Sequence, residues 1–219
     1  MLLQGLVADP SNAASADGST NAVNMGRAND VILSTLHGRY FEQCYRGNIY
    51  YASTVTAGVV IPISSTLTPT YSIWNPAGSG KLCVPIVTLI GWTATTAALG
   101  SFVWHVTTNT GSSFTTAAPI QAFGTGTAVN AFTGAGRVSQ IRTATGGTTT
   151  LAAAATFFRD TGMQLALTTA ASANLAGWIW RDEWEGMTFL PPGNAMHLFG
   201  TTAIALAACV TLVYEAVSL

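Results

Sequence analysis

The segment richest in side chains that could do chemistry holds three tryptophans and three carboxylates within eight residues. It reads Trp178-Ile179-Trp180-Arg181-Asp182-Glu183-Trp184-Glu185. Indole rings can stack on the faces of sugars, and carboxylates can accept hydrogen bonds from sugar hydroxyls. Trp178, Trp180 and Trp184 are therefore candidates for a glycan-binding platform. A glycoside hydrolase would also need two carboxylates at a defined separation across a cleft, which a local acidic run does not establish. The structural interpretation, which we favour, is a strand leading to a charged turn, with the tryptophans in the core and Arg181 paired with a neighbouring acid.

No other motif predicts catalysis or a bound cofactor. A phosphate-binding loop ending at Lys81 would need glycine at 75 and serine or threonine at 82, where this chain has Asn75 and Leu82. The histidines share no ligand spacing with each other, with cysteine or with a carboxylate, and a metal site needs three or four converging ligands. They are His37, His105 and His197. We therefore expect no enzyme activity, no metal site and no cofactor.

A second notable segment is HGRYFEQCYRGNIYY at residues 37–51. It holds four tyrosines, a phenylalanine, two arginines and a histidine. Tyrosine and arginine are enriched in protein interfaces, because each combines a large contact area with hydrogen-bonding capacity. We therefore predict that this region contacts a partner. The candidate contact residues are Arg27, His37, Arg39, Tyr40, Tyr45 and Arg46.

The composition indicates a protein whose surface is covered by neighbours. Of the 219 residues, 49% are hydrophobic and only 8% are charged, about a third of the usual ~25%. A surface built of small uncharged side chains favours self-association, because net charge keeps monomers apart. The net charge is −1, Lys81 is the single lysine and the arginines are scattered. Neither nucleic acid nor a membrane surface is therefore expected as a partner.

The cysteines indicate a reducing compartment. Cys44, Cys83 and Cys209 are odd in number and far apart, with no C-x-x-C pair, which argues against a disulfide framework and a structural zinc site. We predict buried free thiols. The N-terminus has no basic region and too short an apolar run for a signal peptide, and no N-x-Ser/Thr acceptor occurs. These features are typical of a protein made and assembled in a cytoplasm.

The C-terminal residues carry the clearest structural signal. From Ile204 to Tyr214, large side chains fall on every second residue and smaller ones lie between them. This is the period of a strand, and the pattern predicts a strand buried on both sides. Pro191–Asn194 predicts a turn before it. A membrane span is the alternative, but Glu215, the alternation and the lack of flanking lysine or arginine argue against it.

The rest of the chain predicts an all-β fold with an arm. Residues 1–46 are expected to form an extended N-terminal arm, with a short helix over Val31–Leu36, and residues 47–219 a two-sheet β-sandwich. Residues 109–156, rich in threonine, alanine and glycine, are expected to form a long excursion with short strands, exposed at one end of the sandwich or packed on a neighbour. Pro62 and Pro85 should lie on edge strands, at bulges or at strand ends. Strands are predicted at 49–53, 59–63, 70–74, 81–92, 101–108, 163–168, 187–190 and 203–218.

The chain resembles virion structural proteins of tailed bacteriophages. The resemblance lies in LHGRYFEQCYRGNIYYAS, in the NPAGSGK turn before an apolar strand, and in PPGNAMHLFGT before the last strand. Within that group it is most similar to jelly-roll subunits that decorate or cement the capsid. The resemblance implies a non-enzymatic subunit, often a homotrimer, that binds across major capsid protein subunits at the virion surface. The alternative is a phage tail or fibre subunit that binds host glycan through the tryptophans.

Overall fold

The protein is described here from a computed structural model. Its described residues are 39–54, 57–92, 100–108, 129–131, 139–145, 151, 154–165, 179–202 and 207–219. The chain divides into two compact units, residues 1–41 and residues 42–219, and the sandwich described next belongs to the second unit. The predicted helix over Val31–Leu36, the arm before it and most of the 109–156 excursion lie outside the described residues.

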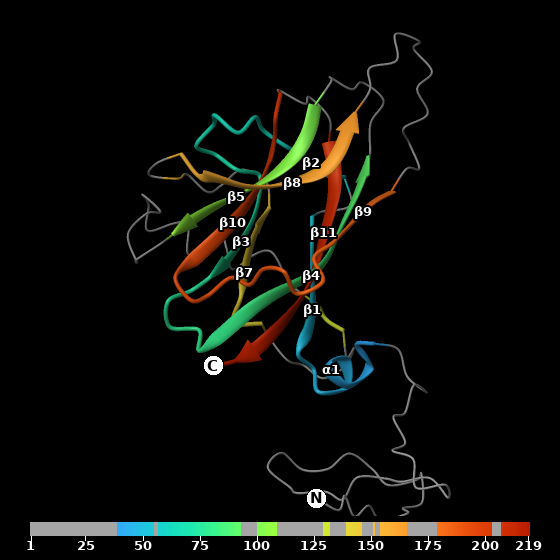
Figure 1. Cartoon of the computed structure of the whole chain (residues 1–219), viewed down its shortest axis with the longest axis vertical. Helices are drawn as coiled ribbons and strands as arrows, with labels where there is room; N and C mark the ends of the chain where they lie inside the picture. The colour runs from blue at the N-terminus through green and yellow to red at the C-terminus, as the bar shows by residue number, and fades with distance from the viewer. Residues whose placement is uncertain are drawn as a thin grey trace, which may run out of the picture. The chain divides into compact units, whose positions relative to one another are not determined.

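The second unit is a two-sheet β-sandwich, as predicted (Figure 1). One sheet has the order β6-β1-β11-β4-β9, with β2 also paired to β11, and the other has the order β7-β3-β10-β5-β8. A short helix, α1 (Phe41–Tyr45), precedes the first strand. The strands are β1 (Ile49–Ser53), β2 (Val59–Val60), β3 (Tyr71–Asn75), β4 (Lys81–Trp92), β5 (Gly100–Thr108), β6 (Val129–Asn130), β7 (Arg142–Thr145), β8 (Thr156–Leu165), β9 (Ile179–Glu183), β10 (Asn194–Gly200) and β11 (Ala207–Ser218).

Eight of the strands pair in a nested order along the chain, so that each pair in sequence encloses the next. The first of them pairs with the last, β1 with β11, and the second with the next to last, β3 with β10. Inside these, β4 pairs with β9 and β5 with β8, and all four pairings are antiparallel. The chain therefore folds back on itself once, between β5 and β8. The strands before this point pair with the strands after it, in both sheets.

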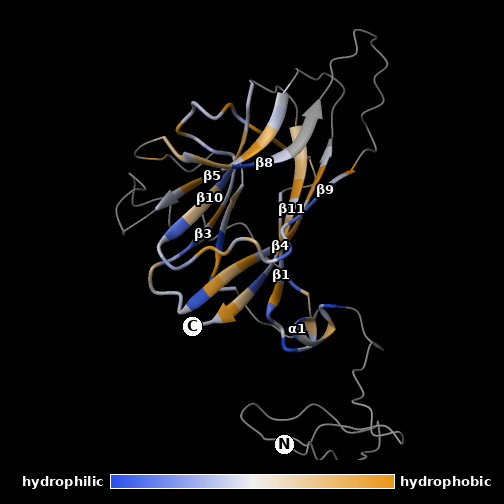
Figure 2. Cartoon of the chain, viewed as in Figure 1, coloured by the Kyte–Doolittle hydropathy of each residue, from blue (hydrophilic) through white to orange (hydrophobic). Residues whose placement is uncertain are grey.

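One face of β11 is buried as the alternation in the sequence predicts, but the other face is not. Ala208, Val210, Leu212 and Tyr214 are fully buried between the sheets, and Figure 2 shows apolar residues along β4 and β11. The intervening residues, from Ala207 to Glu215, are half-buried except for Val213. The prediction of a strand buried on both sides was therefore wrong, because the outer face of this sheet is only partly covered.

Pro85 lies within β4 at an irregularity in the ladder. The β4–β11 register shifts between Val213 and Tyr214, whose partners are Val87 and Pro85. A proline cannot donate a backbone hydrogen bond, so a bulge is where a strand tolerates one. The placement that the sequence predicted for Pro85 is confirmed.

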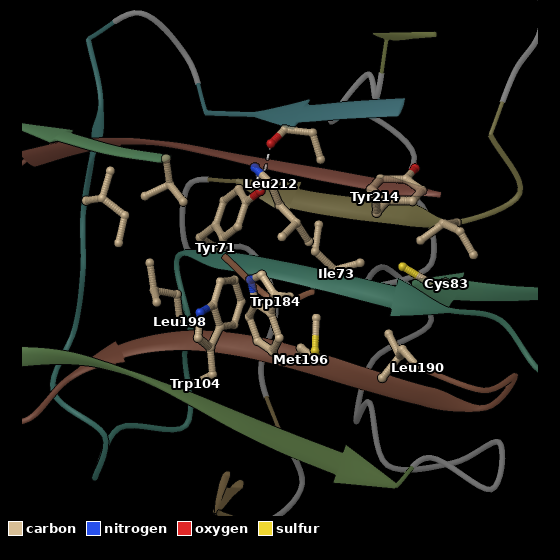
Figure 3. Close-up of a cluster of buried hydrophobic side chains, with 14 of the residues drawn as sticks. Tyr71, Ile73, Cys83, Trp104, Trp184, Leu190, Met196, Leu198, Leu212 and Tyr214 are labelled. Carbon is tan, nitrogen blue, oxygen red and sulfur yellow. Dashed lines mark hydrogen bonds between the residues drawn. The ribbon is translucent and has the colours of Figure 1, made fainter. Parts of the chain in front are cut away.

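A cluster of aromatic side chains joins the two sheets (Figure 3). Trp104 packs edge-on against both Tyr71 and Trp184, with ring centroids 6.2 and 5.7 Å apart. The Tyr71 hydroxyl donates to the Ala52 carbonyl at 2.7 Å and accepts from the Leu212 amide at 3.2 Å. The hydroxyl of Tyr71, a residue of the second sheet, thus forms hydrogen bonds with two strands of the first sheet. Burial raises the pKa of this hydroxyl, so it stays protonated across the ordinary pH range.

One strand, β10, was not predicted, and one predicted strand is wrong. Met187–Leu190 forms no strand, only a bridge from Leu190 to Cys83. β10 instead follows the Pro191–Asn194 turn, and β9 is the strand that the structural interpretation placed before a charged turn, although it extends through the charged residues to Glu183. β8 begins at Thr156, earlier than predicted, and ends at Leu165.

Candidate functional site

Trp184 is part of the core, so the prediction that it contributes to a glycan platform is wrong. Its side chain is 0% exposed, and its indole N–H donates to Thr88 Oγ1 at 2.9 Å. The Arg159 guanidinium lies 4.6 Å from the ring centroid, and the ring of Phe158 stacks at 6.4 Å. A sugar cannot reach an indole that is enclosed in this way. The structural interpretation of this tryptophan holds.

Trp180 is the partly exposed member of the cluster. It is 38% exposed, and its indole N–H donates to the Thr161 carbonyl on β8 at 3.2 Å. Arg181 pairs with Glu183 at 2.7 Å on the outer face, which confirms the predicted pairing with a neighbouring acid. Trp178 lies outside the described residues. The cluster therefore offers one described indole face rather than three.

An ion pair links the edge strands of the two sheets. Arg159 Nη2 on β8 donates to Asp182 Oδ1 on β9 at 2.6 Å, and the same nitrogen bonds to the Glu183 carbonyl at 3.3 Å. Burial raises the pKa of Asp182, the Arg159 charge opposes that rise, and Asp160 adds to it. The pair therefore holds β8 and β9 together but leaves Asp182 easier to protonate than a surface aspartate.

The tyrosine- and arginine-rich segment divides between the surface and the core. Arg27 and His37 lie outside the described residues. Arg39 lies over the ring of Tyr40, 5.4 Å from its centroid. The other two candidate residues, Tyr45 and Arg46, are exposed. Within the same segment, however, Tyr50 is buried and stacks on Tyr214 with centroids 5.6 Å apart.

His197 is enclosed in the second sheet between two hydroxyls. Ser72 Oγ lies 2.7 Å from Nδ1, and Thr107 Oγ1 lies 2.9 Å from Nε2. Burial, with a smaller contribution from His105 on the neighbouring strand, lowers the pKa of His197 to about 3. Because the imidazole is fully buried, the serine–histidine pair has no route to a substrate in this conformation. Its role is to satisfy polar groups between β3, β10 and β5.

The neutral, buried His197 predicts a loss of stability in acid. Its pKa is depressed on folding, so between pH 6.5 and about 3 the unfolded chain binds a proton that the folded chain does not. The free energy of unfolding should fall as pH decreases through this window, by a few kcal/mol in total. Urea titrations at several pH values, compared with His197→Gln, isolate this contribution. An identical pH dependence in both proteins would contradict it.

The other metal-ligating side chains that the structure describes lie apart. The described part of the chain contains no group of three metal-ligating side chains. All three cysteines are free, as predicted, but only Cys83 is buried, while Cys44 and Cys209 are half-buried. No helix among the described residues has the length and apolarity to cross a membrane.

Sequence reasoning missed exposed apolar side chains at two places along one edge of the first sheet, near Gly91 at one end of β4 and near Cys83 at the other. β9 pairs with β4, and Leu190 then bridges to Cys83 at the start of β4, so residues 179–190 follow that edge. Three of its side chains are mostly exposed, Ile179 at 73%, Met187 at 69% and Phe189 at 59%. We call Ile179, Trp180, Met187 and Phe189 the apolar edge. Two further aromatic residues, Phe157 and Phe158, are exposed on β8.

No family model, no curated protein and no solved structure matches this chain.

Proposed function

We propose that this chain is a structural subunit that decorates or cements the capsid of a tailed bacteriophage by binding across major capsid protein subunits. The observation that carries the proposal is the apolar edge, on a protein in which only 8% of residues are charged. Large apolar side chains that lie close together on a surface mark sites of protein–protein interaction, and Met187 and Phe189 are exposed two residues apart on this edge. A subunit in an assembly covers such side chains with its neighbours.

The strand pairing supports the jelly roll that the resemblance implies. A jelly roll has two four-stranded sheets and is formed when one long antiparallel hairpin winds into a sandwich. Its nested pairs are β1 with β11, β3 with β10, β4 with β9 and β5 with β8. The orders β1-β11-β4-β9 and β3-β10-β5-β8 then form the two sheets. We infer a jelly roll to which β2, β6 and β7 are added at the edges.

In the described part of the chain, two of the groups that could do chemistry hold the sandwich together. His197 bonds to Ser72 and Thr107, and Asp182 pairs with Arg159. Exposed polar and aromatic side chains instead suit contact with other proteins, and Tyr45 and Arg46 are among them. This distribution supports a non-enzymatic role. A homo-oligomer remains part of the proposal, as does assembly in the host cytoplasm.

Co-sedimentation with capsids tests the proposal. The chain is co-expressed with the major capsid protein encoded in the same genome, and shells are separated from free protein on a gradient. We expect the chain to travel with the shells. Replacing Met187 and Phe189 by serine should reduce the bound fraction at least about tenfold, because burying one such side chain contributes about 1.5–3 kcal/mol.

Leu67→Ser is the matched control, since Leu67 is also an exposed apolar residue but lies away from the apolar edge in sequence. It should leave the bound fraction unchanged. Recovery of the parent chain only in the unbound fraction would overturn the proposal.

A further inference from the structure

β9 ends its sheet with a free edge. Among the described strands it pairs with β4 only. The Trp184 amide donates to the Ile86 carbonyl of β4 at 2.9 Å, and in an antiparallel ladder the residues that bond to one neighbour alternate with those that face away. The backbone groups of Ile179, Arg181 and Glu183 therefore point to the free edge. The Glu183 carbonyl already accepts a hydrogen bond from Arg159 at 3.3 Å on this side, and its second lone pair is the one that a neighbouring strand could use.

The side chains of the edge-facing residues carry charges of opposite sign. Arg181 and Glu183 are both exposed and lie 2.7 Å apart on the outer face. Edge strands commonly carry charged residues that discourage pairing with another strand. Two charges of opposite sign, two residues apart, can instead favour pairing with a second copy of the same strand. An antiparallel copy presents the charges in the opposite order, so each charge can face one of opposite sign.

We propose that β9 pairs with the β9 of a second copy of this chain. In antiparallel register about a two-fold axis at Asp182, Arg181 of each copy lies opposite Glu183 of the other. Both residues have edge-facing backbone groups, so this register satisfies the hydrogen-bond pattern and forms two pairs of opposite charge. It also places Asp182 of one copy opposite Asp182 of the other, where each carboxylate is already paired with Arg159 of its own chain. Centring the pair on Arg181 instead would place like charges opposite each other. A two-fold contact uses the same surface on both copies, which is the commonest arrangement in homo-oligomers.

The pairing would make the sheets of two copies continuous and cover the start of the apolar edge. Ile179 and Trp180 lie on β9 itself, whereas Met187 and Phe189 lie beyond it and stay available for other subunits. The inference concerns the contact between copies and does not depend on which assembly the chain joins. It also differs from the three-fold ring that the resemblance implies, because a ring needs a head-to-tail contact.

Native mass spectrometry and light scattering of the purified chain over a concentration series test the pairing. We expect a dimer or an even multiple of the chain that dissociates on dilution. Arg181→Glu should place glutamates opposite each other and Glu183→Arg should place arginines opposite each other. Each change should raise the dissociation constant about tenfold or more, because two cross-strand pairs change from attraction to repulsion.

Mixing the two variants provides the decisive control. One copy with two glutamates and one with two arginines are complementary, so the mixture should form a heterodimer although neither variant pairs with itself. Arg142→Glu, the same substitution at an exposed position of β7, should leave the dissociation constant unchanged. A monomer or trimer at every concentration would overturn the proposal. So would single variants that pair as tightly as the parent, or a mixture that gains no heterodimer.

Discussion

Replacing Trp184 by alanine should lower the free energy of unfolding by about 3–5 kcal/mol, the usual cost of removing a fully buried tryptophan. The indole fills the space between Trp104, Phe158 and the Arg159 guanidinium. Its loss leaves a cavity and removes the donor to Thr88. Urea-induced unfolding followed by circular dichroism measures the change.

Trp180→Ala is the matched control, because it deletes the same side chain from a partly exposed position four residues away. We expect it to cost less than about 1.5 kcal/mol, since much of the indole is already in contact with water. Similar losses in the two variants would contradict the assignment of Trp184 to the core. Binding to a glycan array that disappears in Trp180→Ala would instead favour the glycan alternative over the capsid proposal.

Asn75→Asp should destabilise the protein by at least about 3 kcal/mol, because each buried group left without its partner costs about 1–3 kcal/mol. The Asn75 amide nitrogen donates to the carbonyls of Lys81 and Leu190, each at 2.8 Å. Its amide oxygen accepts from Ser79. A carboxylate has nearly the same shape but would place an acceptor against two carbonyl oxygens in a fully buried position.

The loss in the free energy of unfolding caused by Asn75→Asp should be smaller in acid, since a protonated carboxyl regains one hydrogen-bond donor. Asn194→Asp, at a half-buried position where the asparagine follows the Pro191–Gly193 turn, is the control and should cost much less. Thermal or urea unfolding of the three proteins at neutral and acidic pH gives the comparison. An Asn75→Asp variant as stable as its parent would show that the three hydrogen bonds of the Asn75 side chain do not stabilise the turn between β3 and β4.

The strands that the sequence predicts well are those with one buried and one partly exposed face. β4 has the predicted bounds, and β11 differs only where residues 203–206 are not described. β10 has no such contrast, because six of its seven residues are buried on both faces, so no alternation marks it. A strand was expected near β9, but its end was not predicted, because three of its five residues are charged, a composition more typical of a turn than of a strand.

The candidate site depended on tertiary structure that a single sequence does not show. Trp180 and Trp184 share the same strand face by periodicity, but their depth differs because Trp184 meets Trp104 of the other sheet. Ser72 and His197 meet across 125 residues of sequence. The apolar edge was missed for the same reason, since only the pairing to β4 places Ile179 and Phe189 along one sheet edge.

The central proposal makes a tailed bacteriophage the source of this chain, and cryo-electron microscopy of intact particles of that phage tests it most directly. We expect density for the β-sandwich on the outer surface of the capsid, in contact with at least two copies of the major capsid protein and with Met187 and Phe189 covered. Capsids that lack this density, in particles otherwise complete, would contradict the proposal.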